Sequence, residues 1–230
     1  DCLLSRGLGD VYKRQTYRRH DAVVGVSRGV KEDLVSMFPP LRGKVHTIYN
    51  GVPLDNVRKQ GAQRPDGEGD SPYQVVAVGR LEAVKDYATL IDAAALLDDP
   101  GIAFTILGEG SEHAALQKRI DDRPSRTSVT LAGHIDNPFP VIAGAGAFAL
   151  TSIRESFGNV LVEALCLGVP VISTDCPHGP AEILDAGRYG LLVPVGDAAA
   201  LADAVRRLAY DGSIREQLAA QGPELSLIHI

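Results

Sequence analysis

The stretch RESFGNVLVEALCLGVPVISTD, residues 154–175, decides the fold of this chain. Its first half places apolar side chains such as Leu161 and Leu165 at helical spacing, and VPVIS follows as a short apolar run. A helix followed directly by an apolar strand is typical of a parallel sheet that is covered on both faces. Packing alone requires neither Glu155, just ahead of the helix, nor Glu163, inside it. We interpret both carboxylates as ligand-binding groups.

The same alternation of strand and helix extends from residue 73 onward. The runs predicted as strands are YQVVAVG (73–79), IAFTILG (102–108), SVTLAG (128–133), AFALTS (147–152), VPVISTD (169–175) and GLLVPV (190–195). Amphipathic stretches that are typical of helices lie between these runs and after the last one. Because crossovers between parallel strands are right-handed, the pattern predicts an α/β fold with a doubly wound, Rossmann-like parallel sheet. Ligands of such sheets bind at the carboxyl ends of the strands.

Composition narrows the class of ligand. The 230 residues carry 23 Lys and Arg against 29 Asp and Glu, a formal net charge of −6, and nucleic-acid binding usually needs a basic face. We therefore expect no nucleic-acid partner, although a small phosphorylated ligand needs only one or two cations. The three cysteines, Cys2, Cys166 and Cys176, form no CxxC pair and no metal-like cluster, so reduced thiols are expected.

Several boundaries follow from changes in the pattern. Residues 16–59 carry a strand, a helix and a second strand ending at Asn50-Gly51; residues 60–72 are rich in Gly, Asp, Gln and Pro and indicate a linker; residues 73–222 form the Rossmann-like domain. The two ends, residues 1–15 and 223–230, share no periodicity with their neighbours and resemble translated sequencing-adapter read-through. We expect both ends to be non-native, with ordinary frayed termini as the alternative.

The first predicted site cluster follows the strand at 73–79. Gly79 and Arg80 end that strand, and Lys85 opens the next helix. An Arg offers a planar fork and a Lys a point charge, so the two could converge on one anion from two directions. Two such cations could neutralise a diphosphate without a metal. The alternative is a pair of solvated surface charges.

The second cluster lies in the stretch quoted at the start. A helix beginning near Gly158 leaves the amides of Gly158, Asn159 and Val160 unpaired, and such amides bind phosphate. Glu163 lies about 7.5 Å further along the helix axis, where it could accept hydrogen bonds from two ribose hydroxyls. Glu155 would meet a sugar on the far side of the phosphates. The alternative for Glu163 is a partly buried, structurally paired acid.

These residues carry a family resemblance. ESFGNVLVEA resembles the Glu-x7-Glu motif of retaining glycosyltransferases of the GT-B fold, notably family 4, and GRLEAVKD is similar to their GRL…K motif. LGEGSEHAAL, LAGHIDNP, GVPVISTD, GPAEIL and GLLVPVGD follow in that family's order. The resemblance covers roughly residues 21–222. It implies the C-terminal, donor-binding half of a GT-B fold with a remnant of the N-terminal domain.

The resemblance also implies roles for particular residues. Arg80 and Lys85 would bind the donor diphosphate and stabilise its charge as it leaves, Glu155 would contact the transferred sugar, and Glu163 the nucleotide ribose. The amides from Gly158 to Val160 would help to hold phosphate. The remaining implied contacts are the loop of Gly133, His134 and Ile135 near the base, through its backbone more than the imidazole, and the rim loop of Gly108 and Gly110.

The implied activity belongs to the full-length parent. It would transfer a hexose or N-acetylhexosamine from a UDP- or GDP-sugar to a glycan or lipid-linked acceptor, without cofactor or metal. By the same resemblance, an N-terminal domain would bind the acceptor and contribute a catalytic histidine. That domain is largely missing here, so we expect this fragment alone to be inactive. We expect a cytoplasmic protein, and a lipid-linked acceptor leaves open peripheral association of the parent with the inner membrane face.

Three alternatives remain at this stage. A nucleotide-sugar epimerase of GT-B fold would keep the ligand and change the chemistry, and a non-catalytic module would only bind the nucleotide-sugar. An NAD-dependent Rossmann protein is disfavoured because no GxGxxG follows the first strand; GAGAFA, residues 144–149, precedes a strand instead.

Cys176 and His178 lack further metal ligands, so we interpret their segment as a loop over the donor pocket, with Glu182 close behind.

Overall fold

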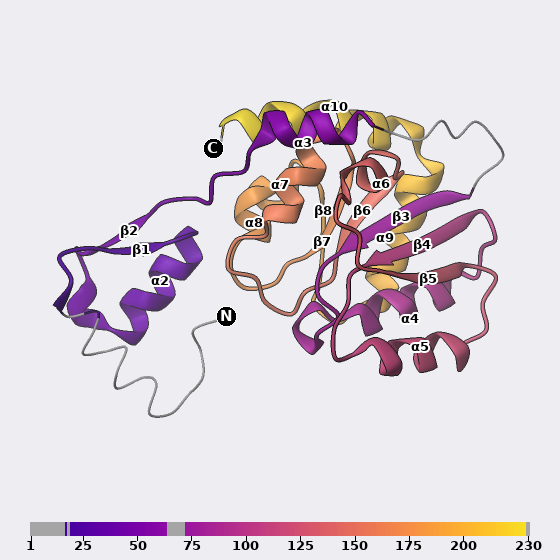
Figure 1. The fold of residues 1–230 in the computed structure, drawn as a ribbon, viewed down its shortest axis with the longest axis horizontal. Coiled ribbons are helices and arrows are strands. Elements are labelled where there is room, and N and C mark those ends of the chain that lie inside the picture. The colour runs from indigo at the N-terminus through magenta and orange to yellow at the C-terminus, as the bar shows by residue number, and fades with distance from the viewer. Residues whose placement is uncertain (1–16, 18, 64–71, 229–230) are drawn as a thin grey trace.

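The computed structural model describes residue 17, residues 19–63 and residues 72–228, the last four by their backbone alone. Strands and helices alternate along this part of the chain (Figure 1). The strands are β1 (Val23–Gly25), β2 (Val45–Thr47), β3 (Tyr73–Val78), β4 (Ile102–Leu107), β5 (Ser128–Gly133), β6 (Ala147–Leu150), β7 (Val171–Thr174) and β8 (Leu191–Val193). The helices are α2 (Arg28–Met37), α3 (Leu54–Gly61), α4 (Tyr87–Leu97), α5 (His113–Asp121), α6 (Phe139–Ala143), α7 (Asn159–Cys166), α8 (Pro180–Ile183), α9 (Ala198–Tyr210) and α10 (Gly212–Ile228), with 3-10 turns η1 (Pro39–Leu41), η2 (Ala83–Lys85) and η3 (Asp185–Gly187).

Two sheets result, and we name the parts that hold them. The small lobe, residues 19–50, contains the parallel pair β1–β2 and α2. The large domain, residues 52–63 and 72–228, contains a six-stranded sheet of order β5-β4-β3-β6-β7-β8, in which every pairing is parallel. This order is that of a doubly wound Rossmann sheet, so the predicted fold class is confirmed. In Figure 1 the small lobe stands to one side, joined by an extended segment.

Burial alternates along the strands of the large domain, because successive side chains of a strand point to opposite faces. Val75 and Ala77 of β3 belong to the core cluster on one face, which α4, α5 and α9 cover. Val76 between them belongs to the cluster on the other face, which α3, α6 and α7 cover. The edge strand β5 differs, because every second residue is exposed there. The expectation of strands buried on both faces therefore fails at this edge.

The ends of the large domain differ from the expected boundaries. Helix α3 continues to Gly61, two residues into the range predicted as a linker, and residues 64–71 lie outside the described residues. Val52 and Val57, which the sequence grouped with residues 16–59, pack in the core of the large domain. Helix α10 runs through the predicted boundary at residue 223 and packs on α7. The tail at residues 1–15 lies outside the described part of the chain.

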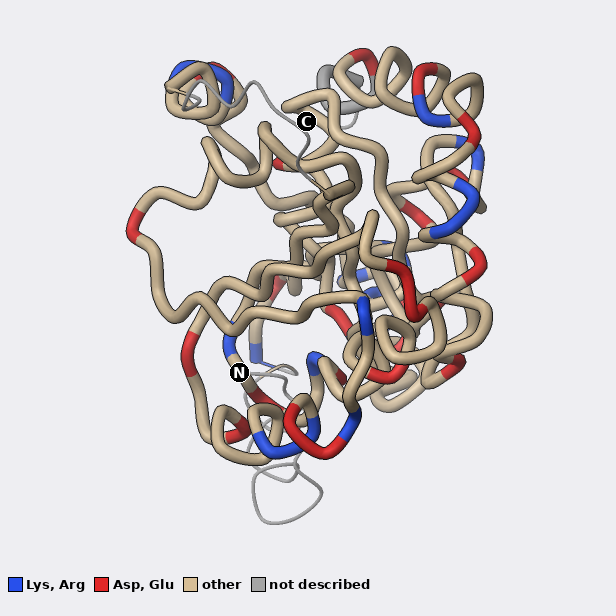
Figure 2. Tube along the Cα trace, turned by 90° about the vertical axis from the view of Figure 1, so that its right-hand side faces the viewer, with Lys and Arg blue, Asp and Glu red and all other residues tan. Residues whose placement is uncertain are grey.

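Charged residues cover the helices and loops of the large domain. In the view of Figure 2, Lys and Arg are interspersed with Asp and Glu along the outer segments. Some of them form ion pairs within one helix, such as Arg58 with Asp55 and Arg206 with Asp203. Exposed pairs of this kind contribute about 0–1 kcal/mol each. In the described part of the chain, no helix combines the length and the apolar character needed to cross a bilayer.

Candidate active site at the carboxyl edge of the sheet

The loops that follow β3, β4 and β5 are bonded to one another at the carboxyl edge of the large sheet. The amide of Gly79 donates to the carbonyl of Leu107 at 3.0 Å, and the amide of Gly108 donates to the carbonyl of Gly133 at 2.7 Å. A Cβ on Gly108 would lie 2.0 Å from the carbonyl oxygen of Gly79, a clash that a backbone atom cannot move away to relieve. Glycine is therefore required where these loops meet.

The chain changes direction between β3 and β6, because the helix after β3 covers one face and the helix after β6 covers the other. This is the topological switch point of the sheet, where doubly wound folds bind ligands. Lys85 follows β3 and Glu155 follows β6, and the ammonium of Lys85 lies 2.5 Å from Oε1 of Glu155. The side chains are only 19% and 13% exposed. An ion pair that is shielded in this way holds both groups in place.

Two hydroxyl groups support that pair, and the sequence analysis missed both. Ser152 is fully buried and its hydroxyl donates to Oε1 of Glu155 at 2.8 Å. The Thr151 hydroxyl donates to the carbonyl of Lys85 at 2.7 Å. The sequence signal for them was a Thr-Ser dipeptide directly after a buried strand. Buried hydroxyls need hydrogen-bond partners, so two of them at a strand end indicate a polar site there.

Gly79 and Tyr87 lie beside this pair. A Cβ on Gly79 would come within 2.8 Å of the Tyr87 hydroxyl and 3.5 Å of Cε of Lys85. Burial raises the pKa of Tyr87 well above its ordinary value, and the negative charge of Glu155 raises it further. Tyr87 therefore stays a neutral phenol next to the ion pair.

Helix α7 begins at a glycine in the left-handed conformation. Gly158 has φ 101° and ψ 54°, and no side chain caps the helix. Among the described residues, the amides of Gly158, Asn159 and Val160 have no recorded acceptor. The Asn159 side chain is engaged elsewhere, because its oxygen accepts from the Asn50 amide at 3.0 Å. The helix start thus presents backbone donors and the positive end of its dipole.

Glu163 lies further along α7 and is half-buried. Burial raises the pKa of its carboxyl group. In the part of the chain that the structure describes, no hydrogen bond or ion pair to this carboxylate is recorded. The alternative of a structurally paired acid therefore finds no partner here. Burial of a carboxylate without hydrogen bonds is costly, and the role of Glu163 toward ribose hydroxyls stays a prediction.

Arg80 and Lys85 pair with different carboxylates in this structure. Its guanidinium pairs with Glu82 at 2.8 Å, and its side chain is 70% exposed. An exposed pair of this kind is weak and rearranges readily. The role of Arg80 at a diphosphate therefore stays a prediction.

The remaining predicted residues lie along the same edge. The imidazole of His134 is 67% exposed and lies 3.2 Å from Asp136, while Ile135 packs against the core. A Cβ on Gly110 would lie 2.3 Å from the carbonyl oxygen of Leu81, so this loop also depends on glycine. Their contacts with a nucleotide stay predictions.

Comparison with known proteins assigns the family. The family model described as "Glycosyl transferases group 1" matches residues 59–225, well over half of the chain. The chain belongs to this family of glycosyltransferases. The predicted resemblance is thereby confirmed. The fold is that of the C-terminal half of a GT-B enzyme, and the described small lobe precedes it.

Individual relatives agree with this assignment. The lipopolysaccharide core biosynthesis glycosyltransferase LpsE of Rhizobium meliloti is 33% identical over 94% of this glycosyltransferase chain and 62% of its own length. An N-acetylgalactosaminyltransferase of Campylobacter jejuni, named for a diphospho-undecaprenol-linked acceptor, is 30% identical over 87% of the chain and 54% of its own. The chain therefore spans about half to three fifths of the length of these relatives.

Solved structures share the fold. HepE of Anabaena in complex with UDP and glucose superimposes with a TM-score of 0.81, at 21% identity over 95% of this chain and 61% of HepE. The pneumococcal O-GlcNAc transferase GtfA in complex with UDP and GlcNAc gives a TM-score of 0.77, at 22% identity over 94% of this chain and 43% of GtfA.

The segment after β7 carries Cys176 and His178. Cys176 is buried, and burial raises the pKa of its thiol to about 11. His178 instead contacts Asp33 of the small lobe, with 2.7 Å between Nε2 and Oδ2. Within the described ranges, no group of three or more His, Cys, Asp or Glu could hold a metal ion.

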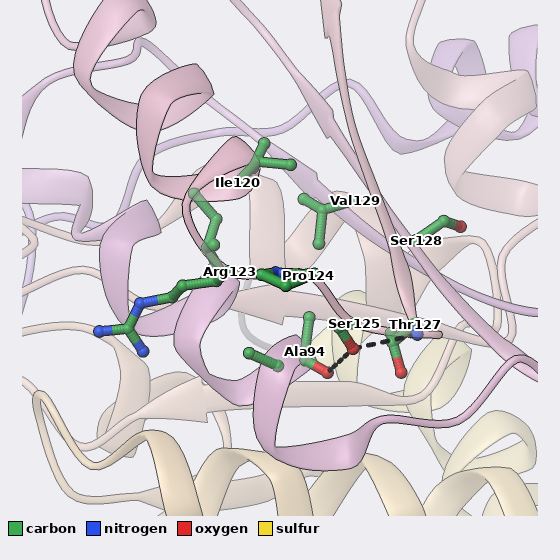
Figure 3. A pocket seen from close by; sticks show the side chains of 10 residues that line it. Ala94, Ile120, Arg123, Pro124, Ser125, Thr127, Ser128 and Val129 are labelled. Carbon is green, nitrogen blue, oxygen red and sulfur yellow. Dashed lines mark hydrogen bonds between the residues drawn. The ribbon is translucent and has the colours of Figure 1, made fainter.

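Two further features lie away from the site. A shallow cavity of about 270 Å³ opens between the carboxyl ends of α4 and α5 and the start of β5 (Figure 3). This is the amino end of the sheet, and the Ser125 hydroxyl there already donates to the carbonyl of Ala94. Gly146 of the GAGAFA stretch packs against Tyr73, whose hydroxyl donates to its carbonyl, so the stretch has a structural role.

Proposed function

We propose that this chain binds a UDP-sugar as the donor part of a retaining glycosyltransferase. The observation that carries the proposal is that one helix, α7, offers both unpaired amides at its start and a half-buried carboxylate, Glu163, neither of which has a partner among the described residues. Beside it lies the shielded pair of Lys85 and Glu155 at the switch point. The family and the UDP named in the HepE and GtfA complexes support this donor class.

Each group then has a chemical task. The amides from Gly158 to Val160 and the ammonium of Lys85 bind the diphosphate, because both are donors with positive potential. Glu163 accepts hydrogen bonds from the two ribose hydroxyls. Glu155, oriented by Lys85 and Ser152, accepts from hydroxyls of the sugar.

The same arrangement serves the departure of the nucleotide. Negative charge grows on the diphosphate as the sugar bond breaks, and preorganised donors lower the barrier for that step. Lys85, Arg80 and the start of α7 supply the positive charge that stabilises it, so we propose that the reaction needs no metal. The full-length enzyme transfers a hexose or N-acetylhexosamine to a glycan or lipid-linked acceptor, as the names of the relatives suggest.

A nucleotide screen tests the proposal. Thermal unfolding of the chain is measured with UDP, GDP and ADP, since a ligand at about 100 times its Kd stabilises by about 2.7 kcal/mol. We expect UDP to raise the Tm, Glu163→Gln to abolish that rise, and the exposed control Glu216→Gln to preserve it. If no nucleotide raises the Tm of the unmodified chain, the proposal is wrong.

Activity of the full-length enzyme separates the alternatives. With a labelled UDP-sugar, transfer requires an acceptor, whereas an epimerase converts the sugar without one and a binding module leaves it unchanged. Activity that survives a chelator supports the metal-free mechanism, and activity that returns only on adding a divalent cation contradicts it.

A further inference from the structure

The segment between β7 and α8 contacts the candidate site on one side. The amide of Glu155 donates to the carbonyl of Pro177 at 3.3 Å. Gly179 packs on the same loop so closely that a Cβ there would lie 1.9 Å from the carbonyl oxygen of Phe157. The segment is therefore packed closely on the loop that carries Glu155 and leads into Gly158.

On its other side the same region contacts the small lobe through Glu182. Both carboxylate oxygens of Glu182 accept from the backbone amide of Arg28, at 2.9 and 3.3 Å, and Oε1 also accepts from the Tyr49 hydroxyl. The side chain is only 18% exposed. Arg28 is the first residue of α2, so a negative charge lies at the positive end of that helix.

Two further contacts involve the same end of α2. The ring of His178 lies against Gly29, where a Cβ would come within 2.4 Å of Nδ1. Its Nε2 lies 2.7 Å from Oδ2 of Asp33, one turn further along the helix. Figure 1 shows α8 on the side of the large domain that faces the small lobe.

Tyr49 contacts both Glu182 and Phe157, which lies in the loop between Glu155 and Gly158. Its ring packs on that of Phe157 with 5.6 Å between centroids, while its hydroxyl donates to Glu182. Burial raises the pKa of Tyr49, and the hydrogen bond to Glu182 raises it further, so the phenol remains a donor. One carboxylate thus holds two separate segments of the small lobe, at Arg28 and at Tyr49.

We propose that Glu182 is a positioning residue that docks the small lobe onto the large domain and fixes its place relative to the Lys85–Glu155 pair. Its consequence for sugar transfer rests on the proposed function. Without Glu182 the Arg28 amide and the Tyr49 hydroxyl lose their shared acceptor, and the start of α2 loses its negative charge. The lobe then samples several positions, while the donor-binding groups, which belong to the large domain, remain in place.

A distance measurement between the two parts tests the docking. Spin labels at Ser36→Cys on α2 and Ala115→Cys on α5, with Cys2 replaced by serine, report the separation by pulsed electron paramagnetic resonance; both positions are exposed, and Cys166 and Cys176 are buried. We expect one narrow distribution for the unmodified chain and for the control Glu216→Gln. Glu182→Ala should broaden it, and Glu182→Gln, which keeps one acceptor oxygen, should give an intermediate width. An unchanged distribution for Glu182→Ala overturns the proposal.

Kinetics of the full-length enzyme tests the positioning role. We expect Glu182→Ala to lower kcat on the order of tenfold to a hundredfold, because small misplacements of reacting groups have effects of that size. The KM for the donor should stay within about twofold, since the donor contacts are untouched. An unchanged kcat, or a loss confined to the donor KM, contradicts the positioning role.

The outcomes separate this inference from the proposed function. If the unmodified chain binds no nucleotide but Glu182→Ala still broadens the distance distribution, the donor site is wrong and the docking stands. If UDP binds and Glu182→Ala leaves the distance distribution unchanged, the docking proposal is wrong and the donor site stands. Should Glu182→Ala fail to fold, Tyr49→Phe removes one donor while keeping the ring on Phe157, and a distribution as narrow as that of the unmodified chain then overturns the proposal.

Discussion

The large domain and the small lobe are both built from parallel strands, yet they bury very different cores. The six-stranded sheet has helices on both faces and two large clusters of buried side chains. In the described part of the small lobe, the buried cluster consists of Leu34, Leu41 and Val45. The side chain of Val24 in β1 is 51% exposed, and that of Ile48, directly after β2, is 60% exposed. A two-stranded sheet with so little core is marginal in water.

The difference in core size matters for the candidate donor site. The candidate donor groups all stand on loops and one helix that the large core supports. The small lobe depends on contacts with its neighbour, among them the docking of α2 on Glu182. We therefore expect the large domain to bind nucleotide without help from a firmly held lobe.

The largest effect is expected from a cavity in the large core. Phe148 is fully buried in the middle of β6, and Phe148→Ala should lower the free energy of unfolding by about 3–5 kcal/mol. The matched change Leu41→Ala in the small lobe, equally buried, should leave the main transition in place. Chemical denaturation measures both. We expect the UDP-induced rise in Tm to survive Leu41→Ala, and its loss there would show that the two parts unfold as one unit.

An intermediate effect is expected at the switch point. Lys85→Met leaves Glu155 shielded without its cation, which should cost about 1.5–3 kcal/mol. The double variant Lys85→Met with Glu155→Gln should recover part of that loss, because the uncompensated charge is gone. Denaturation gives the stabilities, and neither variant should bind UDP as tightly as the unmodified chain. Additive stability losses would show that the two side chains do not interact.

The smallest effect is expected from Glu163 in the absence of ligand. Its pKa is raised, so the folded state binds the proton more tightly than the unfolded state, and the ionised group lowers stability at neutral pH. That penalty is absent below about pH 4, the ordinary range of a Glu carboxyl, and complete once the pH exceeds the raised pKa. Glu163→Gln should therefore stabilise the free chain at pH 7.5 by less than about 1 kcal/mol, since the group is partly exposed to solvent.

Thermal unfolding over a pH series checks this sign. The advantage of Glu163→Gln should shrink as the pH falls toward 4, while Glu216→Gln on the exposed side of α10 should show no such trend. A variant that loses both UDP binding and stability would instead mark Glu163 as a structural residue.

The order of strands and helices in the large domain could be predicted from the amino-acid sequence, because their burial repeats with periods that are local in the chain. The sequence also predicted that Gly79, Lys85, Glu155 and the start of α7 share one edge, since parallel strands all end there. The boundary expected after residue 59 was less accurate. Helix α3 packs into the core of the large domain through Val57, and this contact joins residues far apart in the chain.

Which side chains are partners could not be predicted from the sequence, because it depends on tertiary packing. Lys85 pairs with Glu155 while Arg80 pairs with Glu82, although the sequence places both cations on one loop. Glu182 follows the segment of Cys176 and His178 closely in the sequence, but its partners in the small lobe, Arg28 and Tyr49, are 154 and 133 residues away. Local periodicity records whether a side chain is buried. Its partner depends on which distant segments the packed core brings together.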